Sequence, residues 1–222
     1  MNQACYLRSR CRVRLAVFGV FLVLGVFFIP GVSPTSADDK VPRVRPANWA
    51  APVIGSDLEN FYKVDDKLYR SEQPDDDDFE KIEKLGIKEV LNLRNFHSDD
   101  EEAKDTKLKL HHLRMEAGKV TEADVLRALM LIKAAKGPIL IHCWHGSDRT
   151  GIIAASYRVV FQNWSKENAL DEMNNGGYGF HHKIYPNLIQ LMNKLDVEAC
   201  REKLGITVKP AANRETGEVR QP

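Results

Sequence analysis

The chain has 222 residues, and its 32 lysines and arginines nearly balance its 31 aspartates and glutamates, which gives a formal net charge of +1. A balance this even excludes the strongly basic surface on which nucleic-acid-binding proteins depend, so we expect no nucleic-acid partner. Roughly 150 residues remain after the unusual ends of the chain, enough for one domain with a sizeable core and too few for two.

The first 37 residues have the order of a secretory signal. Four arginines between positions 8 and 14 precede an unbroken apolar run over 15–29, and small and polar residues follow over 30–37. This order is typical of a signal peptide. Cleavage after Ala37 would leave Thr35 at the minus-three position, which is tolerated but not ideal, so an uncleaved N-terminal anchor stays open. In both cases we expect the rest of the chain to lie outside the cytoplasm, and a membrane contact only through this segment.

Two further stretches are predicted to lie outside the domain. Residues 38–55 are rich in proline, carry scattered basic residues and show no periodicity, which predicts a linker. Residues 206–222 are mostly small and polar, which predicts a disordered tail. The folded domain is therefore expected over residues 56–205.

Strands and helices are predicted to alternate within this domain. The predicted strands cover residues 61–64, 68–70, 89–93, 109–115 and 139–142. The predicted helices cover residues 79–85, 101–107, 121–135, 152–161, 165–173 and 186–195. Strands interleaved with helices predict an α/β fold, with a central sheet flanked by helices.

The segment 138–151, PILIHCWHGSDRTG, places a cysteine and an arginine six positions apart between a predicted strand and a predicted helix. The backbone amides of such a loop lie at the positive end of the helix, where anions bind. These amides and Arg149 favour a charged Cys143, so we expect the pKa of its thiol to fall below the free value of about 8.5. The predicted phosphate-binding loop consists of Trp144, His145, Gly146, Ser147, Asp148 and Arg149.

These residue types predict hydrolysis of a phosphate ester without a metal or cofactor. Cys143 can attack phosphorus and hold the phosphoryl group as a thiophosphate, so that two faster displacements replace one slow displacement. Arg149 presents a planar fork of donors that matches two phosphate oxygens. Gly146 lets the backbone approach the ligand, and the hydroxyl of Thr150 can donate to the sulfur when it leaves.

Residues 143–151 resemble the Cys-x5-Arg-Thr/Ser signature of the cysteine-based protein tyrosine phosphatases, and the domain is similar in size to their dual-specificity branch. The other segments that carry the resemblance are LYRSEQP at 68–74, LGIK at 85–88, VLNLR at 90–94, YRVV at 157–160 and WSKE at 164–167. Over roughly residues 60–200, the chain is most similar to the exported bacterial tyrosine phosphatases that regulate biofilm signalling. The resemblance implies a mixed, mostly parallel sheet of the dual-specificity phosphatase type and a periplasmic location. It also implies a phosphorylated protein substrate that carries phosphotyrosine, and a second activity on phosphoserine or phosphothreonine.

A phosphatase of this family also uses an acid to protonate the leaving oxygen. The family supplies an aspartate from an upstream loop, and in this sequence that loop carries Glu116 instead. Asp148 inside the signature is the second candidate. Asp124 is expected to form a helix cap with Thr121.

Four alternatives stay open. A rhodanese-like sulfur carrier also uses a cysteine in an amide-lined loop, although the Arg-Thr-Gly exit fits it poorly. A zinc site of His142, Cys143 and His145 has suitable ligand types but lacks the usual paired spacing. A phosphatase of phosphoinositides or small metabolites is opposed by the carboxylate of Asp148, which repels multiply phosphorylated ligands. A catalytically weak, phosphate-binding pseudophosphatase is consistent with the missing aspartate.

The remaining predictions concern the surroundings of the signature. In an oxidising compartment Cys143 and Cys200 can form a disulfide that blocks the nucleophile, although Cys200 is expected to pack in or beside a C-terminal helix. The ring of His142 is expected to point away from the pocket into a buried hydrogen bond. The glycine-rich loop 176–182 has two aromatic residues that either wall the pocket or pack into the core.

Overall fold

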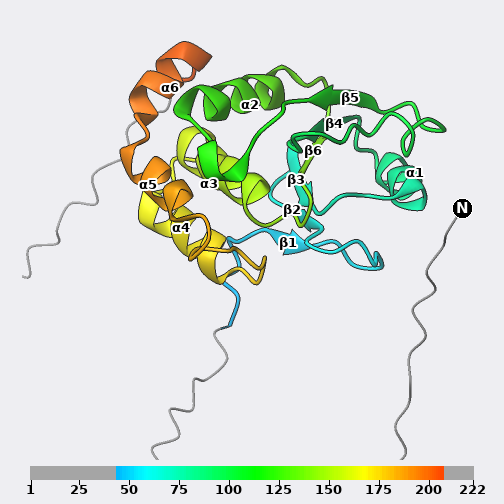
Figure 1. Ribbon diagram of the computed structural model, residues 1–222, viewed down its shortest axis with the longest axis horizontal. Helices are drawn as coiled ribbons and strands as arrows, with labels where there is room; N and C mark the ends of the chain where they lie inside the picture. The colour runs from blue at the N-terminus through cyan, green and yellow to red at the C-terminus, as the bar shows by residue number, and fades with distance from the viewer. Residues whose placement is uncertain (1–43, 208–222) are drawn as a thin grey trace, which may run out of the picture. The chain divides into compact units, whose positions relative to one another are not determined.

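The computed structural model describes residues 44–207; the predicted signal or anchor over 1–37 and the predicted tail beyond residue 207 lie outside this range. Within the described range, none of the helices is both long and apolar enough to cross a membrane. Six strands form one sheet in the order β1-β2-β3-β6-β4-β5 (Figure 1). The strands are β1 (Ala51–Pro52), β2 (Tyr62–Lys63), β3 (Leu68–Ser71), β4 (Glu89–Asn92), β5 (Lys109–His112) and β6 (Ile139–His142).

The sheet is mixed and mostly parallel, as the resemblance implies. Strands β1, β2 and β3 pair in antiparallel fashion, whereas β3, β6, β4 and β5 run parallel to one another. Their registers align the last residues of the four parallel strands, Ser71, His142, Asn92 and His112. The loops that follow these strands therefore leave the sheet at one edge, which is the edge where ligands bind in open α/β sheets.

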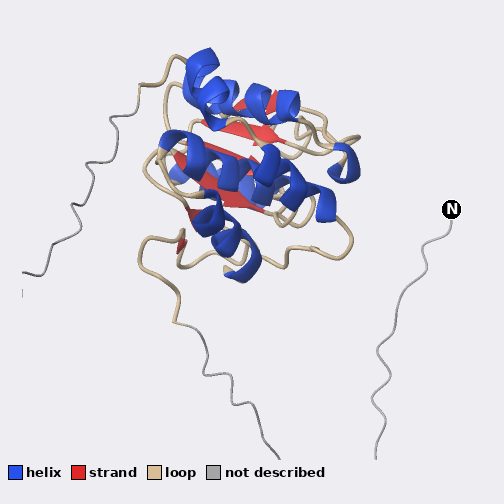
Figure 2. Cartoon of the chain, turned by 90° about the vertical axis from the view of Figure 1, so that its left-hand side faces the viewer, coloured by secondary structure: helices blue, strands red, loops and turns tan. Residues whose placement is uncertain are grey.

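Six α-helices surround the sheet (Figure 2). They are α1 (Asp76–Lys84), α2 (Glu122–Ala134), α3 (Arg149–Phe161), α4 (Lys166–Asn175), α5 (Pro186–Lys194) and α6 (Val197–Leu204). A short 3₁₀ helix, η1 (Ala117–Lys119), precedes α2. The predicted cap of α2 is confirmed, because Thr121 Oγ1 accepts from the amide of Asp124 and the carboxylate of Asp124 accepts from the amide of Thr121.

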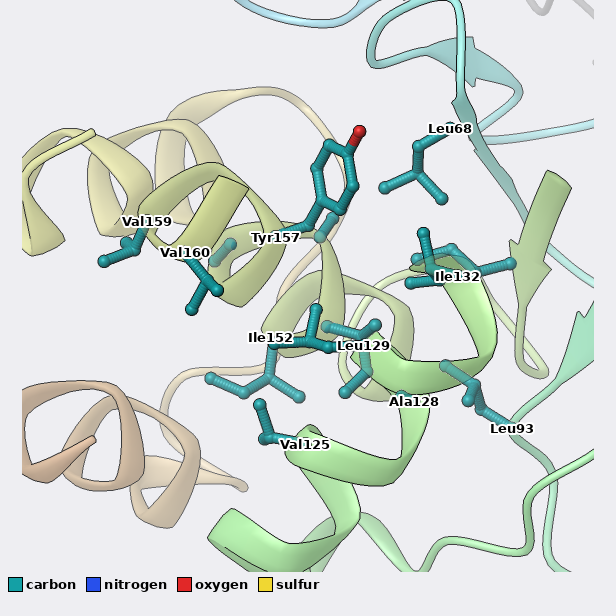
Figure 3. Packing of buried hydrophobic residues seen from close by; sticks show 14 of the residues in the cluster. Leu68, Leu93, Val125, Ala128, Leu129, Ile132, Ile152, Tyr157, Val159 and Val160 are labelled. Atoms are coloured by element: carbon teal, nitrogen blue, oxygen red, sulfur yellow. The ribbon is translucent and has the colours of Figure 1, made fainter. Parts of the chain in front are cut away.

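The core has two parts, one on each face of the sheet. Ile139 and Ile141 of β6 belong to the larger cluster with α2 and α3, while Leu140 between them belongs to the smaller cluster with α1. Successive side chains of a strand point to opposite faces, so this alternation buries β6 on both sides. Figure 3 shows the larger cluster, where Leu129 and Ile132 of α2 face Ile152 of α3.

Three element predictions are corrected by the structure. Residues 101–107 form turns and not a helix, because Ala103 is their one apolar side chain and no helical face can be buried. The strand predicted over 109–115 ends at His112, where its partner β4 also ends. Helix α3 begins at Arg149, three residues before the predicted start of the helix over 152–161.

The linker predicted over 38–55 is also corrected for its described part. Residues 44–52, here called the N-terminal strap, pack on the domain: Ala50 is buried, and its amide donates to the carboxylate of Glu172 over 2.6 Å. Arg45 lies over the ring of Tyr178 and donates to the Tyr178 hydroxyl at 2.6 Å and to the carbonyl of Gly176 at 2.6 Å. The sequence could not predict these contacts, because the residues that the strap binds lie more than 120 positions away in the chain.

Candidate active site

The signature loop connects β6 to α3, and every carbonyl oxygen over residues 143–148 accepts a hydrogen bond from the surrounding protein. Side chains donate to three of these oxygens: the ring of His142 to that of Cys143 (3.4 Å), Asn60 Nδ2 to that of His145 (2.7 Å) and Arg70 to that of Gly146 (2.6 Å). Backbone amides donate to the other three: Gln73 to Trp144 (3.1 Å), Gly151 to Ser147 (3.0 Å) and Ile152 to Asp148 (2.9 Å). By contrast, no hydrogen bond among the described residues uses a backbone amide of residues 144–149. These amides lie at the N-terminus of α3, where backbone N–H groups without a protein partner can bind an anion. The anion cradle itself stays a prediction.

Gly146 is required at the centre of this loop. Its φ is +68°, and a Cβ atom there would lie 2.5 Å from the carbonyl oxygen of Ser71 and 2.6 Å from the amide nitrogen of Glu72. Both obstacles are backbone atoms and cannot rotate away. Only glycine therefore lets the loop pass this close to the end of β3.

Cys143 follows the end of β6, and Arg149 and Thr150 are the first two residues of α3. Cys143 is buried. The guanidinium of Arg149 lies beside the loops that follow β4 and β5, with Nη1 3.5 Å from the carbonyl oxygen of Leu93 and 3.4 Å from that of Met115. Arg149 Nε and Thr150 Oγ1 are buried without a partner among the described residues, so both donors are free for the reaction. The role of Thr150 toward sulfur stays a prediction.

A cavity of about 690 Å³ lies in front of the signature loop. Its wall includes Arg94, Phe96, Met115, Glu116, Trp144, His145, Asp148, Arg149, His181, Ile184 and Tyr185. The structure thus brings Glu116 and Asp148, the two candidate acids, to the same cavity as Arg149.

The two candidate acids differ in how firmly their carboxylates are held by neighbouring residues. The carboxylate of Asp148 accepts from the amide of His181 at 3.0 Å and lies 3.0 Å from the ring Nδ1 of His181, so it holds the 176–182 loop to the signature. Glu116 is largely exposed, and its one ion pair is a surface contact of 3.0 Å with Lys119. A surface pair of this kind is weak. Glu116 can therefore move toward a bound substrate, whereas Asp148 is already engaged.

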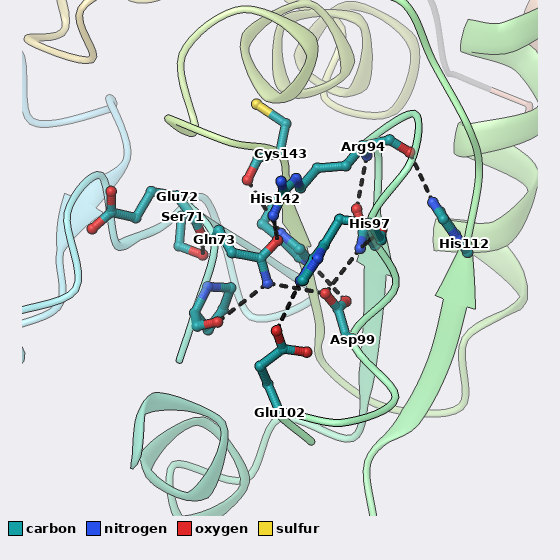
Figure 4. Close-up of polar contacts among 12 residues, drawn as sticks. Ser71, Glu72, Gln73, Arg94, His97, Asp99, Glu102, His112, His142 and Cys143 are labelled. Carbon is teal, nitrogen blue, oxygen red and sulfur yellow. Dashed lines mark hydrogen bonds and ion pairs between the residues drawn. The ribbon is translucent and has the colours of Figure 1, made fainter. Parts of the chain in front are cut away.

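A buried network that the sequence analysis missed supports the loop (Figure 4). The ring Nε2 of His142 lies 2.8 Å from the carboxylate of Asp99, which confirms the predicted orientation of His142. Asp99 also accepts from Gln73 Nε2 at 3.0 Å and from Asn92 Nδ2 at 2.8 Å. Burial raises the pKa of Asp99, but the hydrogen bonds from His142 and Gln73 outweigh burial, so the pKa lies below its ordinary value. Asp99 lies in the acidic run SDDEE at 98–102, which looks like a solvated surface in the sequence.

The network continues to the rim of the cavity. Arg94 Nη1 donates to Gln73 Oε1 at 3.0 Å, and the guanidinium carbon of Arg94 lies 4.2 Å from the centre of a Trp144 ring. Arg94 thus joins the buried network to the first variable residue of the signature. Arg94 lies in a segment that carries the family resemblance, but that segment could not show this contact, because the contact depends on the end of β4 meeting the end of β6.

The aromatic residues of the 176–182 loop pack into the core, which answers the question that the sequence left open. Tyr178 is 1% exposed, and its carbonyl oxygen accepts from Ser147 Oγ at 2.5 Å and from Asn60 Nδ2 at 3.1 Å. Tyr178 and Phe180 therefore support the signature from the side, and only His181 of this loop lines the cavity.

Two possibilities from the sequence lose support: a disulfide between Cys143 and Cys200, and a zinc site at His142, Cys143 and His145. Cys143 and Cys200 are both free thiols, and Cys200 is buried in α6 as predicted, so no disulfide joins them. Among residues 44–207, no group of three or more His, Cys, Asp or Glu side chains is arranged to hold a metal ion. Both ring nitrogens of His142 already face protein oxygens, Nε2 that of Asp99 at 2.8 Å and Nδ1 the carbonyl oxygen of Cys143 at 3.4 Å.

The class of the protein follows from comparison with known families. The model of the tyrosine phosphatase family matches residues 57–197, and the chain belongs to this family. The family resemblance and the fold predicted from the sequence are thereby confirmed.

Individual relatives sharpen this assignment. The chain is 38% identical over 161 residues to the dual specificity protein phosphatase TpbA of Pseudomonas aeruginosa, covering 71% of this chain and 70% of that protein. The crystal structure of TpbA, a tyrosine phosphatase related to biofilm formation, superposes with a TM-score of 0.66 at 32% identity over 73% of this chain and 99% of the other. A more distant relative is the inositol diphosphatase DSP5 of Arabidopsis thaliana, 32% identical over 51% of this chain and 59% of that protein.

Proposed function

We propose that this chain hydrolyses phosphotyrosine in proteins through a phosphocysteine intermediate, with phosphoserine and phosphothreonine as further substrates. The observation that carries the proposal is the cradle of free amides over residues 144–149 with Cys143 and Arg149 at its two ends. Such a cradle can bind one phosphate group, with the sulfur of Cys143 beside it as the nucleophile.

The proposed reaction has two displacements. In the first, the sulfur of Cys143 bonds to phosphorus while the bond from phosphorus to the phenol oxygen breaks, and Glu116 gives that oxygen its proton. In the second, water attacks phosphorus, returns a proton to Glu116 and displaces the sulfur, which releases inorganic phosphate. Arg149 and the loop amides stabilise the charge on the phosphoryl oxygens in both transition states. Thr150 donates to the departing sulfur.

Glu116 is the proposed acid because of its position and its freedom. It lies on the cavity wall with a largely exposed side chain, whereas the carboxylate of Asp148 is held by His181. A proton donor has to approach the leaving oxygen, and a carboxylate with two fixed partners cannot do this without breaking them.

The choice of phosphotyrosine over an inositol diphosphate rests on the rim of the cavity. Phe96, Trp144 and Ile184, here called the apolar rim, are 93%, 54% and 66% exposed. They are three of the seven exposed large apolar side chains in the described range, and all three border this cavity. Exposed apolar residues that gather at one place mark a binding surface for apolar groups. A phosphotyrosine in a polypeptide offers such groups, whereas an inositol diphosphate offers mainly negative charge. The crystal structure of TpbA with bound pTyr supports the same choice.

The location outside the cytoplasm is a separate proposal. Its support is the order of basic, apolar and small residues over 1–37. Fractionation of cells that produce the full chain tests it: the phosphatase domain is expected in the periplasmic fraction, or in the membrane fraction if the segment is retained. Recovery in the cytoplasm would contradict both forms of the proposal.

Turnover of two substrates by the same preparation tests the main proposal. We expect hydrolysis of a phosphotyrosyl peptide that vanadate inhibits, that EDTA leaves unchanged and that Cys143→Ser abolishes. An inositol diphosphate should be hydrolysed at least about tenfold less efficiently, because the carboxylate of Asp148 repels the additional charge. The reverse preference would overturn the choice of substrate. Tight binding of the peptide without turnover would favour the pseudophosphatase.

A further inference from the structure

Arg70 is a buried cation directly beneath the signature loop. It lies in β3 and is 2% exposed. Its guanidinium carbon is 3.5 Å from the centre of the Tyr178 ring, and one of its terminal nitrogens donates to the carbonyl oxygen of Gly146 at 2.6 Å. Its Nε is buried without a hydrogen-bond partner among residues 44–207.

Arg70 differs from the two other buried arginines of the domain. Arg158 forms an ion pair of 2.8 Å with Glu172, and Arg201 forms one of 2.6 Å with Glu198. Arg70 forms no ion pair with a carboxylate in the described part of the chain. A buried charge without a counter-charge is strongly unfavourable, so its retention here needs a reason other than stability.

Two groups that can carry negative charge act on Arg70 without bonding to it: Glu172, which is already paired with Arg158, and Cys143 in the active site. Strand β3 pairs with β6, so that Arg70 lies opposite Ile141 and Cys143 follows two residues later. Burial lowers the pKa of Arg70 from its ordinary value, and the side chains of Tyr178, Glu172 and Cys143 oppose this shift. Cys143 and Arg70 are therefore close enough to interact electrostatically. A phosphate bound in the loop lies beside the same sulfur.

The hydrogen bond to Gly146 has a second effect. A peptide unit whose carbonyl turned into the cradle would face the phosphate oxygens and repel them. Arg70 holds this carbonyl on the side of β3, and Gly146 is the residue whose backbone conformation only glycine adopts easily.

We propose that Arg70 is a positioning residue of the phosphate site: it holds the Gly146 carbonyl away from the cradle and supplies a second, buried positive charge to the anion bound there. This inference rests on the anion site of the proposed function but not on the identity of the substrate.

Two variants of Arg70 test this role, with inorganic phosphate as the probe. Binding is measured by calorimetry and the fold by thermal unfolding. We expect Arg70→Met to weaken phosphate binding by about tenfold or more while Tm stays the same or rises, because an unpaired buried cation has been removed. Arg70→Lys keeps the positive charge but loses the planar set of guanidinium donors, so its affinity for phosphate should lie between those of Arg70→Met and the unmodified protein. With an aryl phosphate, kcat should fall by a larger factor than KM rises, because charge on the phosphoryl group is stabilised most in the transition state.

Arg201→Met is the matched control. Arg201 is also buried and also donates to backbone carbonyls, those of Val159 and Val160, but it lies in α6. This variant should lower Tm and leave phosphate binding unchanged.

Phosphate binding by Arg70→Met within about twofold of the unmodified protein would overturn the inference. If Arg70→Met does not fold, Arg70→Lys decides in the same way: weaker phosphate binding with cooperative unfolding supports the inference, and unchanged binding and kcat overturn it. The proposed function fails separately, if the unmodified chain binds phosphate but does not hydrolyse the phosphotyrosyl peptide.

Discussion

The signature loop has two sides that differ in their surroundings: a carbonyl side, where its backbone oxygens accept hydrogen bonds from the protein, and an amide side, where its backbone N–H groups have no protein partner among the described residues. On the carbonyl side, Arg70, Asn60 and Gln73 satisfy the backbone from buried or partly buried positions. On the amide side lies the cavity, which is bordered by the apolar rim with exposed Phe96 and Ile184. Under the proposed function the two sides have different tasks: the carbonyl side fixes the geometry of phosphate binding, and the amide side selects what carries the phosphate. Variants on the two sides should therefore fail differently.

The largest effect after loss of the nucleophile is expected on the carbonyl side, at Gly146. In Gly146→Ala the new Cβ would meet the backbone of Ser71 and Glu72 at 2.5 to 2.6 Å, so the loop must move and its amides lose their common direction. We expect kcat/KM for an aryl phosphate to fall by about 10³-fold, since misplaced transition-state donors cost this much. Steady-state kinetics and phosphate binding measure it.

Gly86→Ala is the control for backbone strain. Gly86 also has a positive φ, +90°, but a Cβ there meets nothing within 4 Å. It should lose about 1 kcal/mol of stability and keep full activity. Equal activity losses in both variants would mean that the contact of Gly146 with β3 is unimportant.

On the amide side, Glu116 should give the next largest effect. Glu116→Gln cannot give a proton to the leaving oxygen, so kcat for a phosphotyrosyl peptide should fall about 10²-fold. The basic limb of the pH–rate profile should disappear, because that limb reports loss of the acid's proton. Glu116→Asp restores the residue type expected for the family and should keep a bell-shaped profile.

Asp148→Asn distinguishes the two acids. Its expected effect is a looser 176–182 loop and a modest loss in kcat, because the contacts with His181 weaken. If Asp148→Asn loses the basic limb and Glu116→Gln keeps it, the assignment of the acid is wrong.

The apolar rim should affect binding alone. Phe96→Ala is expected to raise KM for an apolar phosphotyrosyl peptide about tenfold, because the contact area of one large side chain is lost. For a small aryl phosphate, which does not reach the rim, KM should not change. Leu85→Ala, a substitution of another exposed apolar residue at the end of α1, serves as the control. A similar rise in KM for both peptide and aryl phosphate would show that Phe96 shapes the phosphate site itself.

The smallest effect on catalysis is expected at Glu89, far from both sides of the loop. Burial raises the pKa of Glu89, but hydrogen bonds from His111, the amide of Lys136 and Lys109 outweigh burial and lower it to about 2. Because the folded pKa lies below the unfolded one, this carboxylate stabilises the fold fully above about pH 5, and the stabilisation is lost as the pH falls toward about 2. Glu89→Gln should thus reduce the free energy of unfolding by roughly 2 kcal/mol at pH 7.

Urea unfolding at several pH values measures this difference. It should shrink below pH 5 and vanish near the folded pKa of about 2. A difference that is the same at all pH values would mean that the ionisation of Glu89 does not stabilise the fold. Activity at pH 7 should be unchanged.

The sequence predicted the parts of the site that lie close together along the chain. Strand β6, the loop and α3 follow one another directly, and apolar runs on both sides of Cys143 and Arg149 made them recognisable. Periodicity also predicted α2, because it buries one face of a regular helix. A local pattern was sufficient in each case.

What the sequence could not predict depends on distant pairings. Arg70 and Asp99 act on the signature from more than 40 positions away. Arg70 lies in a segment that carries the family resemblance, but that segment does not reveal its contact with Gly146. Asp99 lies in an acidic run just before the helix predicted over 101–107, whereas its carboxylate is buried against His142. Such contacts become visible only once the order of the strands is known.

The N-terminal strap has a practical consequence for anyone who produces this protein. A recombinant fragment cut at the start of the family match, residue 57, would omit Arg45 and the amide of Ala50 that binds Glu172. The ring of Tyr178 would then lose one of the two guanidinium groups packed against it, next to the signature loop. Expression boundaries should therefore begin before Val44, even though sequence comparison alone would place that stretch outside the enzyme.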